Sequence, residues 1–274
     1  MVMVHLYISL NIFVIPFWIL CQNILYMEIN KICEKNDECG GDECGGSVRN
    51  KKLETGLTSD LDTIKTYIDS KSHGITSTMH HFESGANNFI RRAIRNIRCS
   101  NAIYEHLLMV WGENMSVMHV VEMNELYASR LRGVGSDAVF QANHIDGPFG
   151  FVPYLTLIRC IVTVCNETDV RTNLGGMVVK MGEGEFLAHD YNRELHYIFG
   201  EQGGDEKRYV LKLHYVLYPD WMPLFWVDLY VWCNVAWNSM ARRLFLFTLN
   251  PQTPIKIFLS WMVNGITILV AKLV

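Results

Sequence analysis

The feature that limits the possible folds most strongly is a change in the pattern of apolar residues between residues 137 and 219. Short runs of apolar and β-branched residues follow one another there, separated by turns that carry Gly, Asn or Asp; they include YLTLIRCIVTV, GGMVVKM, GEFLAHD and RYVLKLHYVLY. No helical pattern of apolar residues lies between them. Strands without intervening helices favour a barrel or a sandwich over an α/β fold. We therefore expect an α+β chain whose β-rich core spans residues 131–220.

The region before this core, residues 58–130, has a helical character. Thr58, Ser59 and Asp60 can cap a helix, and apolar residues then recur at helical spacing in two stretches: Leu61, Ile64, Tyr67 and Ile68, then Phe89, Ile90, Ala93 and Ile97. Residues 28–57 are polar and rich in glycine, which is typical of a linker. We expect N-terminal helices that support the core.

Both ends of the chain are strongly apolar. Residues 2–27 contain no charged side chain and are long enough to cross a hydrocarbon core of about 30 Å, so residues 1–27 are interpreted as a signal-anchor, with a cleaved signal peptide as the alternative. Within 221–274, the segments 222–240 and 257–271 are further candidate membrane helices. The first could instead be an interfacial helix, and either could be a buried packing helix. We expect a membrane location with one or several spans, and the side of the membrane stays open.

The charge of the chain excludes one class of partner. It has 24 Lys and Arg against 28 Asp and Glu, a net charge of −4, and no basic stripe interleaved with aromatic residues. Binding to nucleic acid depends on such a stripe to neutralise phosphates. The sequence therefore predicts no nucleic-acid partner, and the apolar ends predict a membrane partner.

The sharpest local signal is the segment Asn143-His144-Ile145-Asp146-Gly147-Pro148. Side chains two apart on a strand project to the same side, so His144 and Asp146 would converge before Gly147 and Pro148 turn the chain. Two imidazoles and one carboxylate on one face of an octahedron form the Fe(II) site of non-haem oxygenases. An HxD segment alone is also compatible with a polar turn.

The second half of such a site lies downstream. His196 stands in GEFLAHDYNRELHYIFGE, where a Gly-Glu turn leads into strands, and it could face the first pair. Arg208 begins RYVLKLHYVLYP, on a strand expected to pair beside the one that carries His196, and offers a rigid cationic fork for a carboxylate. His189 is the alternative to His196. By the period of two, His214 shares a strand face with Arg208 and would line the pocket or be a buried core histidine.

From His144 to Pro219 the sequence resembles the 2-oxoglutarate and iron(II)-dependent oxygenase superfamily, and within it most the aspartyl/asparaginyl β-hydroxylase family. The likeness is carried by LTLIRCIVTV, by GEFLAHDYNRELH and by RYVLKLHYVLYP, about eighty of the 274 residues. That branch itself tends to lack the acidic iron ligand, whereas this chain has Asp146.

The resemblance implies a double-stranded β-helix core, jelly-roll or cupin-like, with flanking membrane helices. It implies Fe(II) at His144, Asp146 and His196, 2-oxoglutarate as co-substrate with its far carboxylate on Arg208 and its iron-binding end near Arg159, and ascorbate as an accessory reductant. The activity would be hydroxylation of an unactivated C–H bond in a protein side chain of the Asp or Asn type, or in a lipid. A metal-free, membrane-anchored binding module and a helical membrane protein with an accidental HxD are the competing hypotheses.

Overall fold

The structure is a computed structural model of the chain, and it describes residues 51–72, 79–129, 144–200, 202 and 206–249. Contacts divide the residues into two compact units, Gly46–Leu246 and a second unit made of Met1–Gly45 with Phe247–Val274. Every element described below belongs to the first unit, except the last residues of the final helix. The predicted anchor 1–27, most of the linker 28–57 and the apolar segment 257–271 lie outside the described residues.

The described elements alternate between helices and strands in the first half of the chain and are mainly strands in the second. The helices are α2 (Thr58–Ser72), α3 (Asn88–Arg98), α4 (Asn101–Trp111) and α6 (Leu224–Leu249), with short 3-10 turns at Thr55–Leu57, Glu83–Gly85 and Val121–Met123. The strands are β1 (Lys51–Lys52), β2 (Met79–Phe82), β3 (Met115–His119), β4 (Glu125–Ser129), β5 (Thr156–Asn166), β6 (Arg171–Leu174), β7 (Met177–Val179), β8 (Glu185–Asp190), β9 (His196–Phe199) and β10 (Arg208–Pro219).

The described strands form two antiparallel sheets. The larger has the order β1-β8-β5-β10-β4-β2, and β3 pairs with the second half of β10. Its centre is the long pair β5 and β10, which runs from Thr156 opposite Leu217 to Asn166 opposite Arg208 with a register shift between Tyr209 and Val210. The smaller sheet has the order β7-β6-β9. The prediction of an α+β chain built on antiparallel strands is confirmed at this level.

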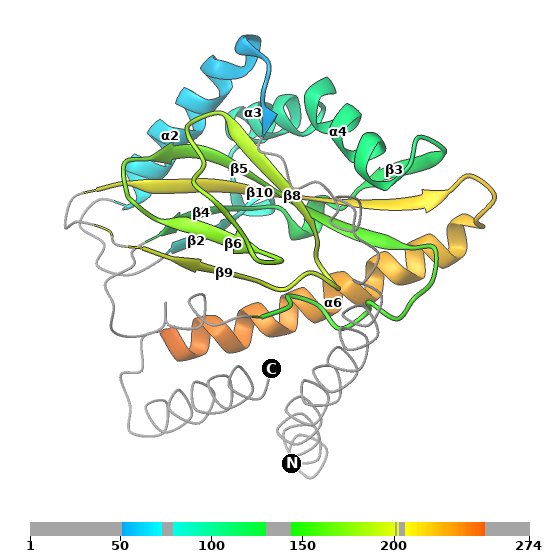
Figure 1. Cartoon of the computed structure of the whole chain (residues 1–274). Helices are drawn as coiled ribbons and strands as arrows, with labels where there is room; N and C mark the ends of the chain where they lie inside the picture. The colour runs from blue at the N-terminus through cyan, green and yellow to red at the C-terminus, as the bar shows by residue number, and fades with distance from the viewer. Residues whose placement is uncertain (1–50, 73–78, 130–143, 201, 203–205, 250–274) are drawn as a thin grey trace. The chain divides into compact units, whose positions relative to one another are not determined.

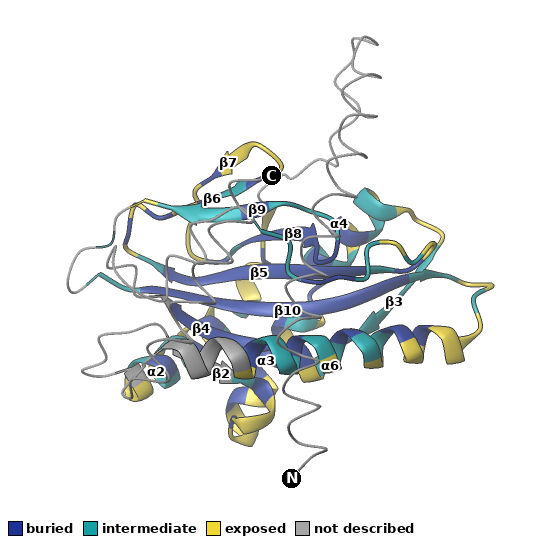
Figure 2. Cartoon of the chain, turned by 90° about the horizontal axis from the view of Figure 1, so that it is seen from below, coloured by how far each residue is buried: buried dark blue, intermediate teal, exposed yellow. Residues whose placement is uncertain are grey.

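Alternate residues of the central strands point to opposite faces of the large sheet. In β10, Leu211 and Leu213 join the apolar cluster on one face, whereas Lys212 and His214 point to the other face. β4, β5 and β8 alternate in the same way. Both faces are covered, and Figure 2 shows β5 and β10 buried along most of their length. Double coverage explains why these strands appear in the sequence as nearly continuous apolar runs.

Helices α2, α3 and α4 cover the apolar face of the large sheet (Figure 1). Both stretches with helical periodicity in the sequence are helices, α2 and α3. The N-terminus of α3 is capped by Asn87, whose side chain accepts a hydrogen bond from the Ile90 N–H at 2.9 Å. The buried stripe of α3 consists of Ile90, Ala93, Ile94 and Ile97. The polar side chains Lys212 and His214 lie on the other face of the large sheet.

Helix α6 lies on that other side of the large sheet (Figure 1), and its packing overturns the interpretation of residues 222–240 as a membrane-spanning helix. Its Val227 and Tyr230 pack on the sheet, while Asn234 and Asn238 are buried and bond Asn192 and Tyr191. Large apolar side chains stay exposed on its outer side: Leu224, Phe225, Trp226, Leu229 and Trp232.

The prediction of one or several spans is wrong for the described part of the chain, where no helix combines the length and the apolarity needed to cross a bilayer. Of the three alternatives for the segment 222–240, a membrane helix, an interfacial helix and a packing helix, the structure excludes the membrane-spanning helix. Its apolar residues divide between a packing face and an exposed face, and Asn234 and Asn238 find partners within the protein.

Strands β1 to β4 lie in ranges that were expected to be linker or helix. β2 and β4 pair with each other, and β4 pairs with β10, so the large sheet extends beyond residues 131–220. The sequence ELYAS carries a polar residue that the fold buries, Glu125 at 0% exposure. A buried polar residue in a short strand interrupts the alternation of apolar and polar residues by which a strand is recognised in a sequence.

Candidate metal centre

Main-chain pairing brings together two histidines that are far apart in sequence. His144 forms an isolated antiparallel bridge with His196, the first residue of β9, and each N–H donates to the carbonyl of the other at 3.1 and 3.0 Å. Residues directly opposite each other in such a pair project to the same side. The centroids of the two rings are 4.5 Å apart. The bridge therefore sets the spacing of the two imidazoles.

Asp146 follows at a turn that packs tightly on the segment before β9. The Gly147 N–H donates to the Tyr191 carbonyl at 3.1 Å, and the indole N–H of Trp237 in α6 donates to the Asp146 carbonyl at 3.1 Å. A Cβ on Gly147 would lie 2.1 Å from Asn192 Oδ1. Only glycine permits so close an approach. The main chain around Asp146 is thus held from two sides.

The three side chains present their donor atoms to a common point. One donor atom each from His144, Asp146 and His196 lie within 4.8 Å of one another. His196 Nε2 is 3.3 Å from Asp146 Oδ2, and His144 Nε2 is 3.9 Å from Asp146 Oδ1. Two imidazoles and a carboxylate with space on one side are the donor set that suits non-haem Fe(II). The residues present therefore fit this metal.

The orientation of His196 also fits metal binding. Its Nδ1 lies 3.2 Å from the Glu194 carbonyl oxygen, which can only accept, so Nδ1 carries the hydrogen and Nε2 presents a lone pair toward the site. Histidines that bind metals are commonly fixed by such a bond from the other ring nitrogen. His196 is thus held in the tautomer that a metal needs.

Asp146 is ionised because of its neighbours. Burial opposes ionisation, but the charge of Arg159 and the contacts with His196 and His189 outweigh it and hold the pKa of Asp146 well below its usual range. Arg159 Nη1 donates a short hydrogen bond to Asp146 Oδ2. The carboxylate is therefore available as an anionic ligand at neutral pH.

Three residues form a row across the large sheet beside Asp146. His214 of β10, Arg159 of β5 and His189 of β8 are directly opposite one another in the register. Arg159 Nε donates to His214 Nε2 at 3.0 Å. His189 Nε2 lies 3.8 Å from Asp146 Oδ2, beyond hydrogen-bond distance. Neither ring nitrogen of His189 has a hydrogen-bond partner among the described residues, and burial lowers the pKa of His189 to about 3, so the ring is neutral.

The candidate ligands open into a cavity between the two sheets. Its polar lining comes from His144, Asp146, Arg159, His196, Arg208 and Lys212, with apolar side chains of β5, β9 and β10 between them. Arg208 is 5% exposed, and no carboxylate of the described residues forms an ion pair with it. Burial lowers the pKa of Arg208, yet a guanidinium keeps its charge. Among the described residues, the guanidinium of Arg208 therefore has no carboxylate partner in the cavity.

Lys212, unlike Arg208, has a carboxylate partner among the described residues. Its Nζ lies 3.0 Å from Glu125 Oε1, and Arg242 of α6 donates to the same carboxylate oxygen. Burial lowers the pKa of Lys212 to about 8, although Glu125 opposes this. Glu125 is fully buried and connects β4, β10 and α6 by charge.

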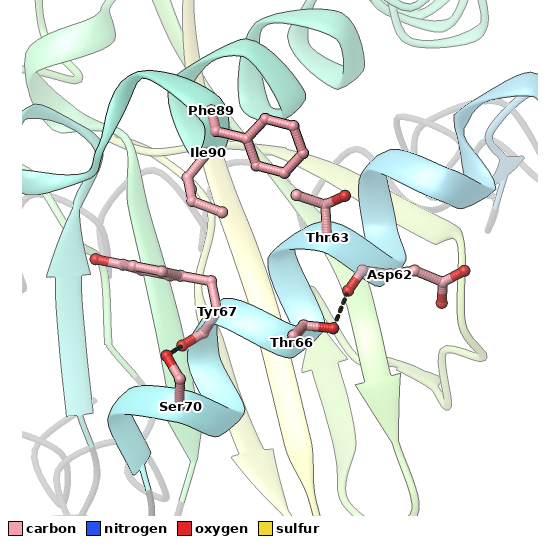
Figure 3. Close-up of a pocket in the computed structure, with 7 residues that line it drawn as sticks. All are labelled: Asp62, Thr63, Thr66, Tyr67, Ser70, Phe89 and Ile90. Carbon is pink, nitrogen blue, oxygen red and sulfur yellow. Dashed lines mark hydrogen bonds between the residues drawn. The ribbon is translucent and has the colours of Figure 1, made fainter.

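A second hollow lies on the opposite side of the large sheet, between α2 and α3 (Figure 3). Its hydroxyl groups bond the carbonyls of their own helix: Thr66 Oγ1 donates to Asp62 O, and Ser70 Oγ donates to Tyr67 O. No cluster of metal-ligating side chains among the described residues lies there. The cavity between the sheets is thus the candidate site.

The structure gathers the residues singled out in the sequence around this one cavity. His144, Asp146, His196, Arg159 and Arg208 line it, and His214 stands behind Arg159. The expected pairing of the strands that carry His196 and Arg208 is wrong, because β9 pairs with β6 in the small sheet while β10 is central in the large one. The two residues instead line the same cavity from different sheets.

Lys212 and Glu125 were missed by sequence reasoning. Lys212 could have been found, since it shares the period of two with Arg208 and His214 in β10. Glu125 carries no signal in the sequence, because its short strand was not recognised.

Comparisons with known proteins give only distant likenesses. No family model matches the sequence, and the search of curated proteins found no match. Among solved structures, a non-heme monooxygenase, ThoJ in a nickel complex, is 14% identical with a TM-score of 0.37 and covers 64% of this chain and 77% of its own. A structure of prolyl 4-hydroxylases from Phytophthora capsici is 14% identical with a TM-score of 0.39, and the match covers 69% of this chain and 67% of that chain.

AviO1 from Streptomyces viridochromogenes Tue57 is 10% identical with a TM-score of 0.40, covering 64% of this chain and 90% of its own. At these values the likeness assigns neither a family nor an activity. The functional inference rests on the geometry of the site.

Proposed function

We propose that the chain is an Fe(II)- and 2-oxoglutarate-dependent oxygenase that hydroxylates an unactivated C–H bond. The observation that carries this proposal is the convergence of His144, Asp146 and His196 in a cavity that is also lined by Arg208, whose charge no carboxylate of the described residues pairs. His144 and His196 would hold iron through Nε2, and Asp146 through a carboxylate oxygen. Iron bound with 2-oxoglutarate and dioxygen supplies the oxidising power for such a reaction.

The remaining lining suits a dicarboxylate co-substrate. Arg208 lines the same cavity as the candidate ligands and offers a rigid fork of donors to a distal carboxylate, which would neutralise its buried charge. Ile161, Ile198 and Val210 add apolar side chains to the lining. The protein thus binds and orients the co-substrate at both of its ends.

The finer parts of the proposal come from the sequence. The two antiparallel sheets that face each other across the site are consistent with a double-stranded β-helix. We place the activity at the level of the superfamily, because Asp146 departs from the aspartyl/asparaginyl β-hydroxylase branch. The proposed substrate is a protein side chain or a lipid, and ascorbate would serve as an accessory reductant.

The test is formation of succinate from 2-oxoglutarate by the purified full-length chain, reconstituted anaerobically with Fe(II) and then exposed to air. We expect turnover in the wild type and a loss of about 100-fold or more in His144→Ala, since one of three ligands is removed. In Arg208→Met we expect KM for 2-oxoglutarate to rise by about 10- to 100-fold, because a charge-assisted bond contributes about 1.5–3 kcal/mol.

Equal turnover in wild type and His144→Ala would contradict the proposal. A wild-type chain that takes up no Fe(II), with no turnover, would favour the competing function, a metal-free binding module. Iron content after reconstitution separates these outcomes.

A further inference from the structure

The peptide group that joins Asp146 to Gly147 is hydrogen-bonded at both of its polar atoms. The Asp146 carbonyl accepts from the indole N–H of Trp237 at 3.1 Å, and the Gly147 N–H donates to the Tyr191 carbonyl at 3.1 Å. Because a peptide group is planar, bonds at its two polar atoms fix the orientation of the plane. The Cα of Asp146 lies in that plane, so the two bonds also restrict the direction in which the carboxylate projects.

Helix α6 supports both of these bonds from one of its faces. Asn238 accepts from the Tyr191 hydroxyl at 3.2 Å. Asn192, the next residue after Tyr191, donates to Tyr230 Oη at 2.8 Å and to Asn234 Oδ1 at 3.1 Å. The side chains of α6 that take part recur at helical spacing: Tyr230, Asn234, Trp237 and Asn238. Of these four, Trp237 bonds the main chain of a candidate ligand directly.

The position of Trp237 differs from that of the other two tryptophans of α6. Trp226 and Trp232 are 53% and 67% exposed, whereas Trp237 is partly buried and its indole reaches the Asp146 carbonyl. An indole has one polar hydrogen and can only donate it. The side chain of Trp237 therefore supplies a single donor, and that donor is used on Asp146.

We propose that Trp237 is a positioning residue for the metal centre, which orients the Asp146 carboxylate by holding the main-chain carbonyl of the same residue. This inference rests on the proposed function, because it requires Asp146 to be a metal ligand. It goes beyond that function in one respect: the packing of α6 on the large sheet becomes a condition for tight metal binding, although α6 supplies none of the three candidate ligands.

The experiment measures binding of Mn(II) to the full-length chain. Calorimetry gives the affinity, and the line shape of the electron paramagnetic resonance signal reports the symmetry of the ligands. Trp237→Phe keeps an aromatic ring and removes the donor. We expect its affinity for Mn(II) to fall by about tenfold, which is the lower end of the effect of groups that hold a metal ligand. The line shape should also change, because the carboxylate is no longer held in one direction.

Trp232→Phe is the matched control, because it makes the same substitution in the same helix at an exposed position. Its affinity and line shape should equal those of the wild type. The tryptophan analogue 3-benzothienylalanine at position 237 keeps the shape of the indole and lacks only the N–H, so it tests the same bond if Trp237→Phe does not fold. Circular dichroism and urea-induced unfolding confirm that each protein is folded before titration.

Wild-type affinity and line shape in the Trp237 variants would overturn the role of Trp237 and leave the proposed function standing, even if the variants unfold at a lower urea concentration. An equal loss of affinity in Trp232→Phe would also overturn it, because a general disturbance of α6 would then explain the change. A wild type that binds no Mn(II) would remove both this inference and the metal site on which it rests.

Discussion

At the scale of single residues, the absence of a Cβ at Gly147 allows the turn that follows Asp146 to pack against Asn192. We predict that Gly147→Ala weakens Mn(II) binding by about tenfold or more, since a Cβ 2.1 Å from Asn192 Oδ1 must displace the turn and with it a ligand. Calorimetric titration of the full-length chain measures this.

Gly85→Ala is the matched control, because a Cβ there would meet nothing within 4 Å. Its affinity should equal that of the wild type. Unchanged binding in Gly147→Ala would show that the turn can shift without moving the carboxylate, which would contradict the tight coupling inferred from the packing.

At the scale of elements, Glu125 of β4 connects α6 to the large sheet through its bond from Arg242. We predict that Arg242→Met lowers the free energy of unfolding by about 2–3 kcal/mol, because it removes a charged partner from a fully buried carboxylate. Urea-induced unfolding followed by circular dichroism measures the loss.

The neighbouring Arg243 is exposed and provides the control, since Arg243→Met should change the free energy of unfolding by no more than about 0.5 kcal/mol. Equal stabilities of the two variants would show that the contact between Arg242 and Glu125 contributes nothing.

The elements that could be predicted from sequence are those whose patterns reflect burial on a regular repeat. β5, β8 and β10 match the runs LTLIRCIVTV, GEFLAHD and RYVLKLHYVLYP, since apolar residues fill both sheet faces there. α3 was predictable because its buried isoleucines recur at helical spacing.

Other features depend on tertiary contacts that no local pattern records. The bridge between His144 and His196 joins segments about fifty residues apart, and the placement of β9 in the small sheet follows from its pairing with β6. The sequence left the segment 222–240 open between a membrane helix and a packing helix, because hydropathy does not distinguish a packing helix with buried asparagines from a membrane segment.

At the scale of the whole molecule, the candidate ligands connect the segment before β5 to the small sheet, with Arg159 of the large sheet beside them. A metal that binds only the folded chain should therefore stabilise all of these parts together. We predict that Mn(II) at 100 times its dissociation constant raises the free energy of unfolding by about 2.7 kcal/mol. Urea-induced unfolding with and without Mn(II) measures the gain.

His144→Ala should abolish this gain, since it removes a ligand from one side of the connection. A gain of the same size in His144→Ala would mean that Mn(II) binds elsewhere, and would contradict the site between the sheets.

The alternation of side chains in β5 and β10 has a consequence for how this protein can vary. A deletion of one residue inside β10 would invert every later position, moving His214 among the helices and Leu213 into the cavity. Two deleted residues would preserve the parity of the strand. In a central strand, the residues that line the cavity therefore alternate with the residues that pack against the helices. Substitutions at the cavity-facing positions can change what the cavity binds while the residues that pack against the helices stay the same.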